Sequence, residues 1–313
     1  MRVLLTGGNG LVGKAIRRVA AELDCDWELD APSRLELNLS SQAAISEWFG
    51  GRRYDAIIHA AARVGGIKAN ITYPTAFLAE NALINTLVIE AARLHDVRNL
   101  LFVGSSCMYP KDLEKKLEET DILTPPLEPT NEGYALSKIL GARHCSAIAS
   151  EFGLNYRTVI PCNLYGPDDH FDLEKGHLVA SALRKVSMAH SLSLPSVEIW
   201  GDGTARREFM YVDDLARFVI DWLPRLEDLP QLINVGVGHD HTVNDYYRIA
   251  AEVVGYAGSF EHDISRPAGM RRKLMDVGRS NSLGWQAKTL LDDGMRQAYL
   301  GMLQQDAQAA RKV

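Results

Sequence analysis

A glycine-rich turn near the start of the chain constrains the fold more than any other feature. Val3 to Thr6 is a short apolar run, and residues 14–23 have apolar side chains at helical spacing. Glycines at 7, 10 and 13 lie between them. In a strand–turn–helix unit such glycines permit a tight turn, close approach of the backbone to a pyrophosphate, and close helix–strand packing. An incidental glycine-rich turn is the alternative, but this context predicts a dinucleotide site at Gly7, Asn9, Gly10, Leu11, Val12 and Gly13.

Strand and helix patterns alternate through the first half of the chain. Residues 54–62, 99–103 and 156–160 are apolar runs, as expected when helices cover both faces of a parallel sheet. A helix is expected from about Pro74 to His95, and His59, inside an apolar run, is expected to be a core histidine. This order predicts an α/β fold with a doubly wound parallel (Rossmann) sheet.

The pattern changes after Pro167, where a polar loop leads to His177 and a further helix. A strand is expected at 197–200, and residues 209–223 and 232–235 are expected to return to the first sheet. Small elements are expected over 241–313. The predicted division is a nucleotide-binding domain, 1–164 with 209–236, and a smaller α/β C-terminal substrate domain, 165–208 with 237–313.

Composition excludes several classes of function. The 313 residues are 46% hydrophobic and carry a net charge of −6, which gives no general attraction to nucleic acid or to an anionic membrane. The four cysteines have neither zinc-site spacing nor the density of a disulfide scaffold. We therefore expect no metal site, and we expect the protein to reside in a reducing cytoplasm. No apolar run approaches the roughly 20 residues of a membrane helix.

The residues at the end of the second predicted strand, around positions 29–31, set the preference of such a fold for NAD or NADP. An acidic residue there accepts the ribose hydroxyls, whereas a basic one accommodates a 2′-phosphate. Asp30 and Arg34 offer both, with Ser33 beside the arginine. We favour NADP, held by Arg34 with Ser33; the alternative is that Arg34 is a solvated loop residue.

A hydroxyl, a phenol and an ammonium form the candidate catalytic group. Ser105 follows Gly104 at the end of the strand over 99–103, where open α/β sheets bind ligands. Tyr134 and Lys138 are four residues apart and share a face of a predicted helix. We expect the ammonium and an oxidised nicotinamide to lower the pKa of the phenol. Tyr134 would then protonate a ketone oxygen as hydride arrives, with Ser105 hydrogen-bonded to that oxygen.

These residues resemble the extended short-chain dehydrogenase/reductase family, and within it the GDP-L-fucose synthases. The closer resemblance is carried by residues 62–67, 104–110, 127–132, 163–167, 200–201, 207–209 and 272–276, so it covers nearly the full chain. It implies NADPH-dependent reduction at C4 of GDP-4-keto-6-deoxymannose after epimerisation at C3 and C5, by a homodimer. The helices after Pro74 and Thr130 are where we expect such a dimer to form.

The resemblance also implies roles for further residues. Cys107 and His177 match the acid–base pair of the family, whereas related dehydratases place acidic residues just after the catalytic serine or threonine. By the same resemblance, the residues expected to lie against the nicotinamide end of the cofactor are Gly104, Pro161, Asn163, Leu164 and His177. The residues expected to contact the GDP-sugar are Lys185, Trp200, Arg207 and Arg272. For Cys107, His177, Trp200 and Lys185 the alternatives are ordinary packing or solvated positions.

The basic cluster Arg266, Arg271, Arg272 and Lys273 is the natural partner of a substrate phosphate, unless it is only a solvated face. Asn9 occupies a position where some members of the family carry an arginine for the 2′-phosphate, which weakens the prediction of NADP. Ala268 stands where an aspartate is usual, and this leaves a colitose-type or deoxyheptose GDP-4-keto sugar open as substrate. A non-catalytic dinucleotide-binding sensor is disfavoured because such proteins tend to lose the tyrosine or the lysine.

Overall fold

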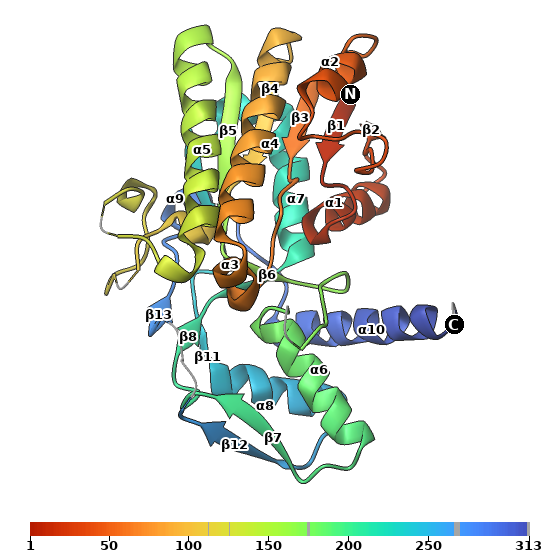
Figure 1. Ribbon diagram of the computed structural model, residues 1–313, viewed down its shortest axis with the longest axis vertical. Helices are drawn as coiled ribbons and strands as arrows, with labels where there is room; N and C mark the ends of the chain where they lie inside the picture. Colours follow the sequence, from red (N-terminus) through yellow and green to blue (C-terminus); the bar gives the residue numbers. More distant parts are fainter. Residues whose placement is uncertain (112, 125, 174–175, 266–269, 312–313) are drawn as a thin grey trace.

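The computed structural model describes residues 1–111, 113–124, 126–173, 176–265 and 270–311. Its centre is a six-stranded parallel sheet in the order β10-β5-β4-β3-β1-β2 (Figure 1). The strands are β1 (Arg2–Thr6), β2 (Glu28–Asp30), β3 (Ala56–His59), β4 (Asn99–Val103), β5 (Asn155–Pro161) and β10 (Leu232–Val235). β1 separates β2 from β3, so the strand order reverses there, and a ligand crevice is expected beside the carboxyl end of β1.

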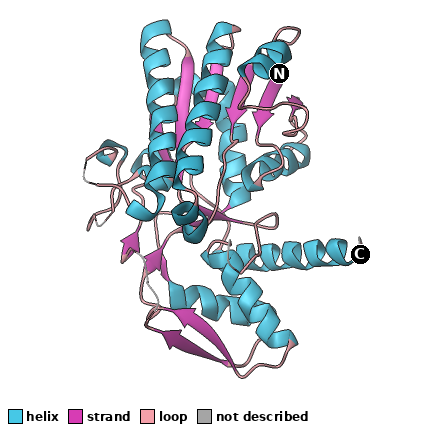
Figure 2. Cartoon of the chain, in the orientation of Figure 1, coloured by secondary structure: helices cyan, strands magenta, loops and turns pink. Residues whose placement is uncertain are grey.

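Helices cover both faces of the sheet, as the apolar strands require (Figure 2). One layer contains α4 (Pro74–Leu94), α5 (Glu132–Phe152) and α2 (Gln42–Phe49), and the other contains α1 (Leu11–Glu22) and α7 (Val212–Trp222). α5 ends at Gly153, whose φ of 68° is a left-handed conformation that glycine adopts without strain. His59 is fully buried in β3 between Thr6 and Asn85, which confirms that it is a core histidine.

A second hydrophobic cluster lies below the carboxyl ends of the central strands (Figure 1). It contains α6 (Leu178–Ser191) and α8 (Val243–Val254), together with the parallel pair β7 (Ser196–Trp200) and β12 (Ser259–Asp263). A three-stranded sheet joins β11 (His241–Thr242), β8 (Arg206–Arg207) and β13 (Arg272–Lys273). The remaining elements are α3 (Ile67–Thr72), β6 (Asn163–Tyr165), β9 (Phe209–Tyr211), α9 (Gly278–Ser282) and α10 (Leu291–Ala310).

Two expectations about the second half were wrong in part. β10 joins the central sheet as predicted, but Phe209–Tyr211 pairs with β6 in a separate two-stranded sheet. The region after residue 240 contains α8 and α10, of 12 and 20 residues, besides short strands. The division into two domains at the stated boundaries stays a prediction.

The described residues contain neither a candidate membrane span nor a candidate metal site. None of the helices there combines the length and the apolar character needed to cross a bilayer. Within the same ranges, no three histidine, cysteine, aspartate or glutamate side chains are grouped to hold a metal ion.

Candidate active site

The glycine turn forms a close-packed anion site between β1 and α1. Gly7 has a φ of 79°, and a Cβ added to Gly13 would lie 2.2 Å from the Gly7 carbonyl oxygen. Any side chain at Gly13 would therefore separate α1 from β1. Gly10 is the N-cap of α1, and no side chain caps this helix end. The backbone amides and the helix dipole at this end suit a pyrophosphate.

The end of β2 favours a 2′-phosphate over a free ribose. A Cβ on Gly8 would lie 2.9 Å from the Ala31 Cβ, so β2 ends against the glycine turn. The Tyr54 hydroxyl donates to the Asp30 carboxylate at 2.5 Å, which engages the acid that would accept ribose hydroxyls. Arg34, in the turn that follows, is exposed. The donors present therefore fit NADP.

Ser105 and Cys107 meet at the carboxyl end of β4. Ser105 has an extended backbone and caps a 3₁₀ turn over Ser106–Met108, where its Oγ accepts a hydrogen bond from the Cys107 amide at 3.2 Å. Gly104, just before it, donates to the Val159 carbonyl of β5 at 2.8 Å. The turn leaves the Cys107 side chain partly exposed on the same edge of the sheet as Ser105.

Tyr134 and Lys138 face this strand end from the first turns of α5. Lys138 is 2% exposed, and its Nζ donates to the Val103 carbonyl at 2.7 Å and lies 5.9 Å from the centre of the Tyr134 ring. Burial lowers the pKa of Lys138 to about 7, while the nearby Cys107 sulfur opposes this shift. The lysine is therefore anchored to the strand that ends at Ser105, the candidate catalytic serine.

The expected lowering of the Tyr134 pKa by Lys138 is not what the structure shows. Burial and the Cys107 sulfur raise the pKa of Tyr134, and a hydrogen bond with the Ser105 hydroxyl lowers it in part. The physical reason is desolvation, which penalises the charged phenolate when the side chain is buried. Tyr134 is thus held protonated, which suits a proton donor in the reductive direction.

Two residues around Cys107 were not assigned to proton transfer from the sequence. The Asn131 amide donates to the Cys107 Sγ at 3.3 Å, and the Lys273 ammonium lies 3.9 Å from the same sulfur. Asn131 lies in the segment 127–132 that carries the family resemblance, and Lys273 belongs to the basic cluster expected to bind a substrate phosphate. The contact of Lys273 follows from pairing of β13 with β8, which no local pattern indicates.

His177 is the N-cap of α6, and its side chain is exposed. Over the described ranges no hydrogen bond joins it to Cys107, so the structure does not bring the two predicted acid–base groups into direct contact. Asn163 lies at the start of β6, where its amide donates to the Glu208 carbonyl at 3.1 Å. Pro161 ends β5 and Leu164 is half-buried in β6, beside the carboxyl ends of the sheet.

Lys185 and Trp200 lie close together on the lower lobe, which is the part of the molecule built around the second hydrophobic cluster with α6, α8, β7 and β12. The Lys185 Nζ lies 5.3 Å from the centre of the Trp200 ring and donates to the Glu198 carbonyl at 3.1 Å. Trp200 is 52% exposed and so presents a ring face to solvent instead of filling the core. An exposed ring beside an ammonium suits a nucleotide base next to its phosphates.

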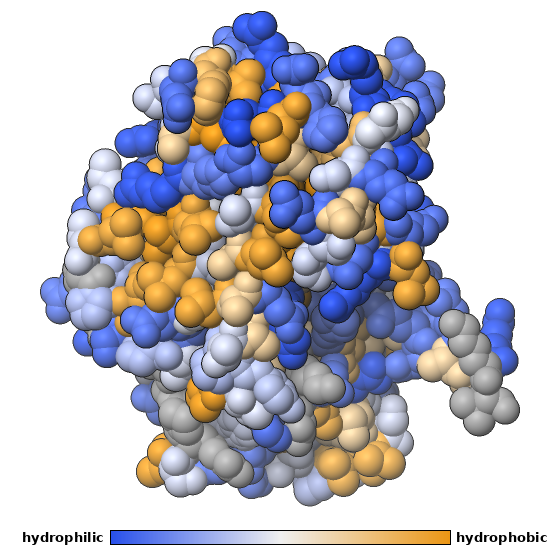
Figure 3. All heavy atoms as spheres, turned by 45° about the horizontal axis from the view of Figure 1, so that its top comes forward, coloured by the Kyte–Doolittle hydropathy of each residue, from blue (hydrophilic) through white to orange (hydrophobic). Residues whose placement is uncertain are grey.

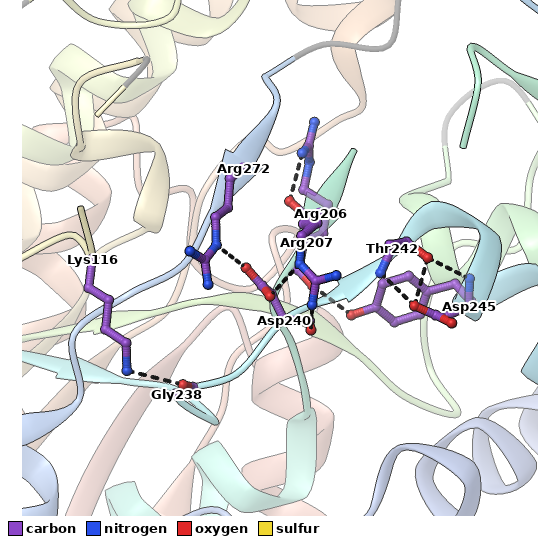
Figure 4. A network of polar contacts seen from close by, with 9 residues as sticks. Lys116, Arg206, Arg207, Gly238, Asp240, Thr242, Asp245 and Arg272 are labelled. Carbon is purple, nitrogen blue, oxygen red and sulfur yellow. Dashed lines mark hydrogen bonds and ion pairs between the residues drawn. The ribbon is translucent and has the colours of Figure 1, made fainter. Parts of the chain in front are cut away.

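Arg207 and Arg272 lie on neighbouring strands, and Figure 4 shows them with Asp240. Arg272 Nε donates to Asp240 at 2.5 Å, and Arg206 Nε donates to the same buried carboxylate at 2.7 Å. Burial lowers the pKa of Arg207, whose guanidinium also donates to the Arg206 carbonyl at 2.8 Å. Arg271 is exposed next to this pair, whereas Arg266 and Ala268 lie outside the described residues.

The chain as a whole is similar to proteins named as nucleotide-sugar enzymes. The model of the NAD dependent epimerase/dehydratase family matches residues 3–236. The chain is 45% identical to the GDP-L-colitose synthase of Yersinia pseudotuberculosis, an alignment that covers 94% of this chain and 96% of the relative. It is 43% identical to the GDP-L-fucose synthase of Azorhizobium caulinodans, with 95% of each chain covered.

Solved structures of similar fold extend over the whole chain. A GDP-6-OMe-4-keto-L-xylo-heptose reductase from Campylobacter jejuni superposes with a TM-score of 0.90 at 28% identity, covering 97% of this chain and 98% of the other. A GDP-mannoheptose C4 reductase from the same organism, solved with NADP bound, has a TM-score of 0.87 at 28% identity and covers 96% and 98%.

Proposed function

The chain belongs to the NAD dependent epimerase/dehydratase family, and from that premise we propose that it catalyses the reaction of a GDP-L-fucose synthase. Its substrate is then GDP-4-keto-6-deoxy-D-mannose, which it epimerises at C3 and C5 and reduces at C4. The observation that carries this proposal is the thiol of Cys107, set beside Ser105, Tyr134 and Lys138 at the end of β4. Ser106 and Cys107 occupy the positions where a dehydratase would place acids.

Reduction at C4 uses the hydroxyl groups at the strand end. NADPH supplies the hydride when bound in the cradle of Gly7, Gly10 and Gly13. Tyr134, held protonated by burial, gives its proton to the C4 oxygen. Ser105 donates a hydrogen bond to the same oxygen, and buried Lys138 fixes the phenol relative to β4. A general acid so placed contributes typically about 10²–10⁴ in rate.

Epimerisation uses the same carbonyl before it is reduced. The C4 ketone acidifies the protons at C3 and C5, so removal of either gives an enolate whose oxygen Ser105 and Tyr134 stabilise. Cys107 and His177 carry the protons to and from the two carbons. The Asn131 amide and the Lys273 ammonium, both against the Cys107 sulfur, stabilise negative charge on it.

The nucleotide part of the substrate is assigned to the lower lobe. Trp200 and Lys185 are placed to hold the guanosine and a phosphate. Arg207 and Arg272 are placed to hold the diphosphate, on strands next to Lys273. The cofactor assignment is NADP, with Arg34 at the 2′-phosphate and Gly104, Pro161, Asn163, Leu164 and His177 toward the nicotinamide.

Turnover of the purified protein tests this function directly. GDP-4-keto-6-deoxy-D-mannose with NADPH should give loss of the reduced-nicotinamide absorbance and formation of GDP-L-fucose. Tyr134→Phe should lower the rate by about 10²–10⁴ because the proton donor is lost. Tyr73→Phe, at an exposed tyrosine, is the matched control. An undiminished rate in Tyr134→Phe would remove the short-chain reductase mechanism.

A second candidate keeps the chemistry and changes the sugar. The relative at 45% identity is a GDP-L-colitose synthase, and the solved neighbours include a heptose reductase. The matching substrate is a GDP-4-keto-3,6-dideoxy or a GDP-4-keto-heptose sugar. Higher kcat/KM with one of these than with GDP-4-keto-6-deoxy-D-mannose would select this candidate.

The assembly proposed is a homodimer through α4 and α5. Leu78 and Leu83 on α4 and Leu136 and Leu140 on α5 are 38–45% exposed, and Figure 3 shows apolar surface gathered on one side of the molecule. A second copy of the same helix pair offers a matching apolar face. The proposed location is the cytoplasm, supported by the four cysteines, all of which have free thiols.

A further inference from the structure

A cavity of about 190 Å³ lies beside Tyr134, the candidate proton donor. It is found where α3 and the first turn of α4 meet the 3₁₀ turn over Pro129–Asn131 and the start of α5. These elements gather near the carboxyl ends of the central strands (Figure 1). Ile71, Pro74 and Phe77 give the cavity apolar walls. Pockets for complete small ligands usually measure about 300–1,000 Å³, so this cavity suits one part of a substrate.

Asn70 brings an unused hydrogen-bond acceptor to this cavity. Its side chain is buried, with the residue 6% exposed, and its Nδ2 donates to the Gly65 carbonyl at 2.8 Å and to the Gly66 carbonyl at 3.1 Å. These two bonds fix which end of the amide carries the oxygen. The Oδ1 atom is buried and has no hydrogen-bond partner among the described residues. Because a buried acceptor left unpaired is costly, its place beside a cavity points to a ligand that donates.

Asn131 brings a second acceptor of the same kind. Its Nδ2 donates to the Cys107 Sγ at 3.3 Å, while its Oδ1 is buried and without a partner over the same ranges of the chain. Amide oxygens and the Glu132 carboxylate, which also lines the cavity, disfavour an anion such as a phosphate. A neutral hydroxyl group attached to an apolar carbon fits both the two oxygens and the apolar walls.

The cavity adjoins the place where the sugar reacts. This step rests on the proposed function, in which Tyr134 meets the C4 oxygen and Cys107 reaches C3 and C5. A group on a carbon next to C4 then faces the cavity, because Tyr134 lines it and Asn131 joins it to Cys107. In a 6-deoxy sugar C5 carries a methyl group, which donates no hydrogen bond. C3 carries a hydroxyl, which does.

We propose that the cavity is the subsite for the hydroxyl at C3 of the sugar, and that Asn70 is the specificity-determining residue that accepts its hydrogen bond. A 3-deoxy sugar would leave the Asn70 oxygen unpaired when bound. Sites built to hydrogen-bond a substrate hydroxyl reject analogues that lack it strongly. The chain should therefore favour a 3-hydroxy sugar over a 3,6-dideoxy sugar, which separates the first candidate substrate from its dideoxy alternative.

The test compares two ligands that differ only at C3, GDP-L-fucose and its 3-deoxy analogue GDP-L-colitose. Calorimetry with the NADP-saturated protein should show that the wild type binds GDP-L-fucose at least about tenfold more tightly. Asn70→Ala should weaken binding of GDP-L-fucose alone and bring the two dissociation constants within about twofold of each other. The ratio of kcat/KM for the two matching 4-keto substrates should change in the same way.

Asn81→Ala is the matched control. Asn81 is a fully buried asparagine that bonds both the amide and the carbonyl of Arg63, close in the chain to the loop held by Asn70, and it does not line the cavity. This variant should leave the ratio of the two dissociation constants unchanged. If Asn70 only supported the loop, Asn70→Ala would weaken both ligands equally and also leave the ratio unchanged.

Two results overturn the proposal: equal affinity of the wild type for the two ligands, or an unchanged ratio in Asn70→Ala. Weaker NADPH binding in Asn70→Ala with an unchanged ratio would assign the oxygen to the cofactor instead. GDP-sugars that bind without being turned over overturn the proposed function alone, and the ratio of dissociation constants still decides the role of Asn70. If no GDP-sugar binds, both the function and the subsite are wrong.

Discussion

Buried ionisable groups at the end of β4 explain why local sequence spacing was not enough to describe the catalytic residues. The i, i+4 spacing correctly placed Tyr134 and Lys138 on one helix face, but it carried no information about desolvation. In the folded chain Lys138 is almost fully buried and bonded to the Val103 carbonyl, and burial lowers its pKa to about 7. The lysine therefore works mainly as a buried anchor for the helix that carries Tyr134.

Lys138 should give the folded protein a characteristic pH dependence. An unfolded lysine keeps its proton up to pH 10.5, whereas the folded one loses it near pH 7. Between these values the unfolded chain binds more protons here, so this residue makes stability rise with pH, by at most about 1.4 kcal/mol per pH unit. Urea unfolding at several pH values should show the difference, wild type minus Lys138→Met, increasing from pH 7.5 to 9.5. A flat difference would contradict the burial of the ammonium.

Cys107 should carry proton exchange and not cofactor binding. Cys107→Ser replaces the thiol proposed to exchange protons by a hydroxyl, which is a much weaker acid, so deuterium entry from solvent at C3 and C5 should fall by about 10²–10⁴. NADPH affinity should stay within about twofold, measured by fluorescence titration. Cys25→Ser, at a partly exposed thiol away from the site, is the control. Full epimerisation by Cys107→Ser would refute the assignment.

Lys273→Met should lower solvent deuterium entry less than Cys107→Ser does, because the ammonium near the Cys107 sulfur is removed while the thiol stays.

At the scale of elements, β13 explains the contact between Lys273 and Cys107. It pairs with β8 so that Lys273 lies beside Arg207 and Arg272 beside Arg206. One strand of two residues thus carries both Arg272, proposed to bind the diphosphate, and Lys273, whose ammonium lies near the Cys107 thiol.

The contact between β1 and α1 is the element on which cofactor binding depends. Gly13→Ala would place a methyl group 2.2 Å from the Gly7 carbonyl oxygen and force α1 away from the turn. We expect NADPH affinity to fall more than tenfold and the free energy of unfolding to fall by about 1–3 kcal/mol, as for overpacking. Gly51→Ala, where a Cβ has open space around it, should change neither quantity. Unchanged affinity in Gly13→Ala would show that the turn is not the pyrophosphate site.

At the scale of the whole molecule, the proposed active site draws on two parts of the chain, the carboxyl ends of the central strands and the lower lobe beneath them (Figure 1). Tyr134 and Ser105 belong to the sheet side, while Lys185, Trp200 and Arg207 belong to elements of the second core. The sugar is therefore proposed to react at the sheet while its nucleotide is held by the lobe. The relative placement of the two hydrophobic cores therefore sets the distance that a bound GDP-sugar must span between the nucleotide-binding residues and the candidate catalytic residues.

The proposed dimer gives a prediction at this scale. Light scattering after size exclusion should give twice the 34.6 kDa mass of one chain. Leu83→Glu combined with Leu140→Glu should give the mass of one chain, because two charges on the apolar face would have to be buried. Leu303→Glu, on the exposed part of α10, should leave the mass unchanged. A wild-type mass of one chain would rule out the α4–α5 dimer under those conditions.

The sequence by itself determined the class of fold, and it predicted the cofactor turn and the candidate catalytic side chains, because each depends on short-range spacing. Glycines at fixed intervals, continuous apolar strands and an i, i+4 pair carry their physical meaning within a few residues. Only the tertiary structure decided which polar groups meet. Lys273 near Cys107 and Asp30 against Tyr54 join segments that are far apart in the sequence. The pKa of Tyr134 was misjudged for the same reason, since desolvation depends on the whole fold and not on neighbours in sequence.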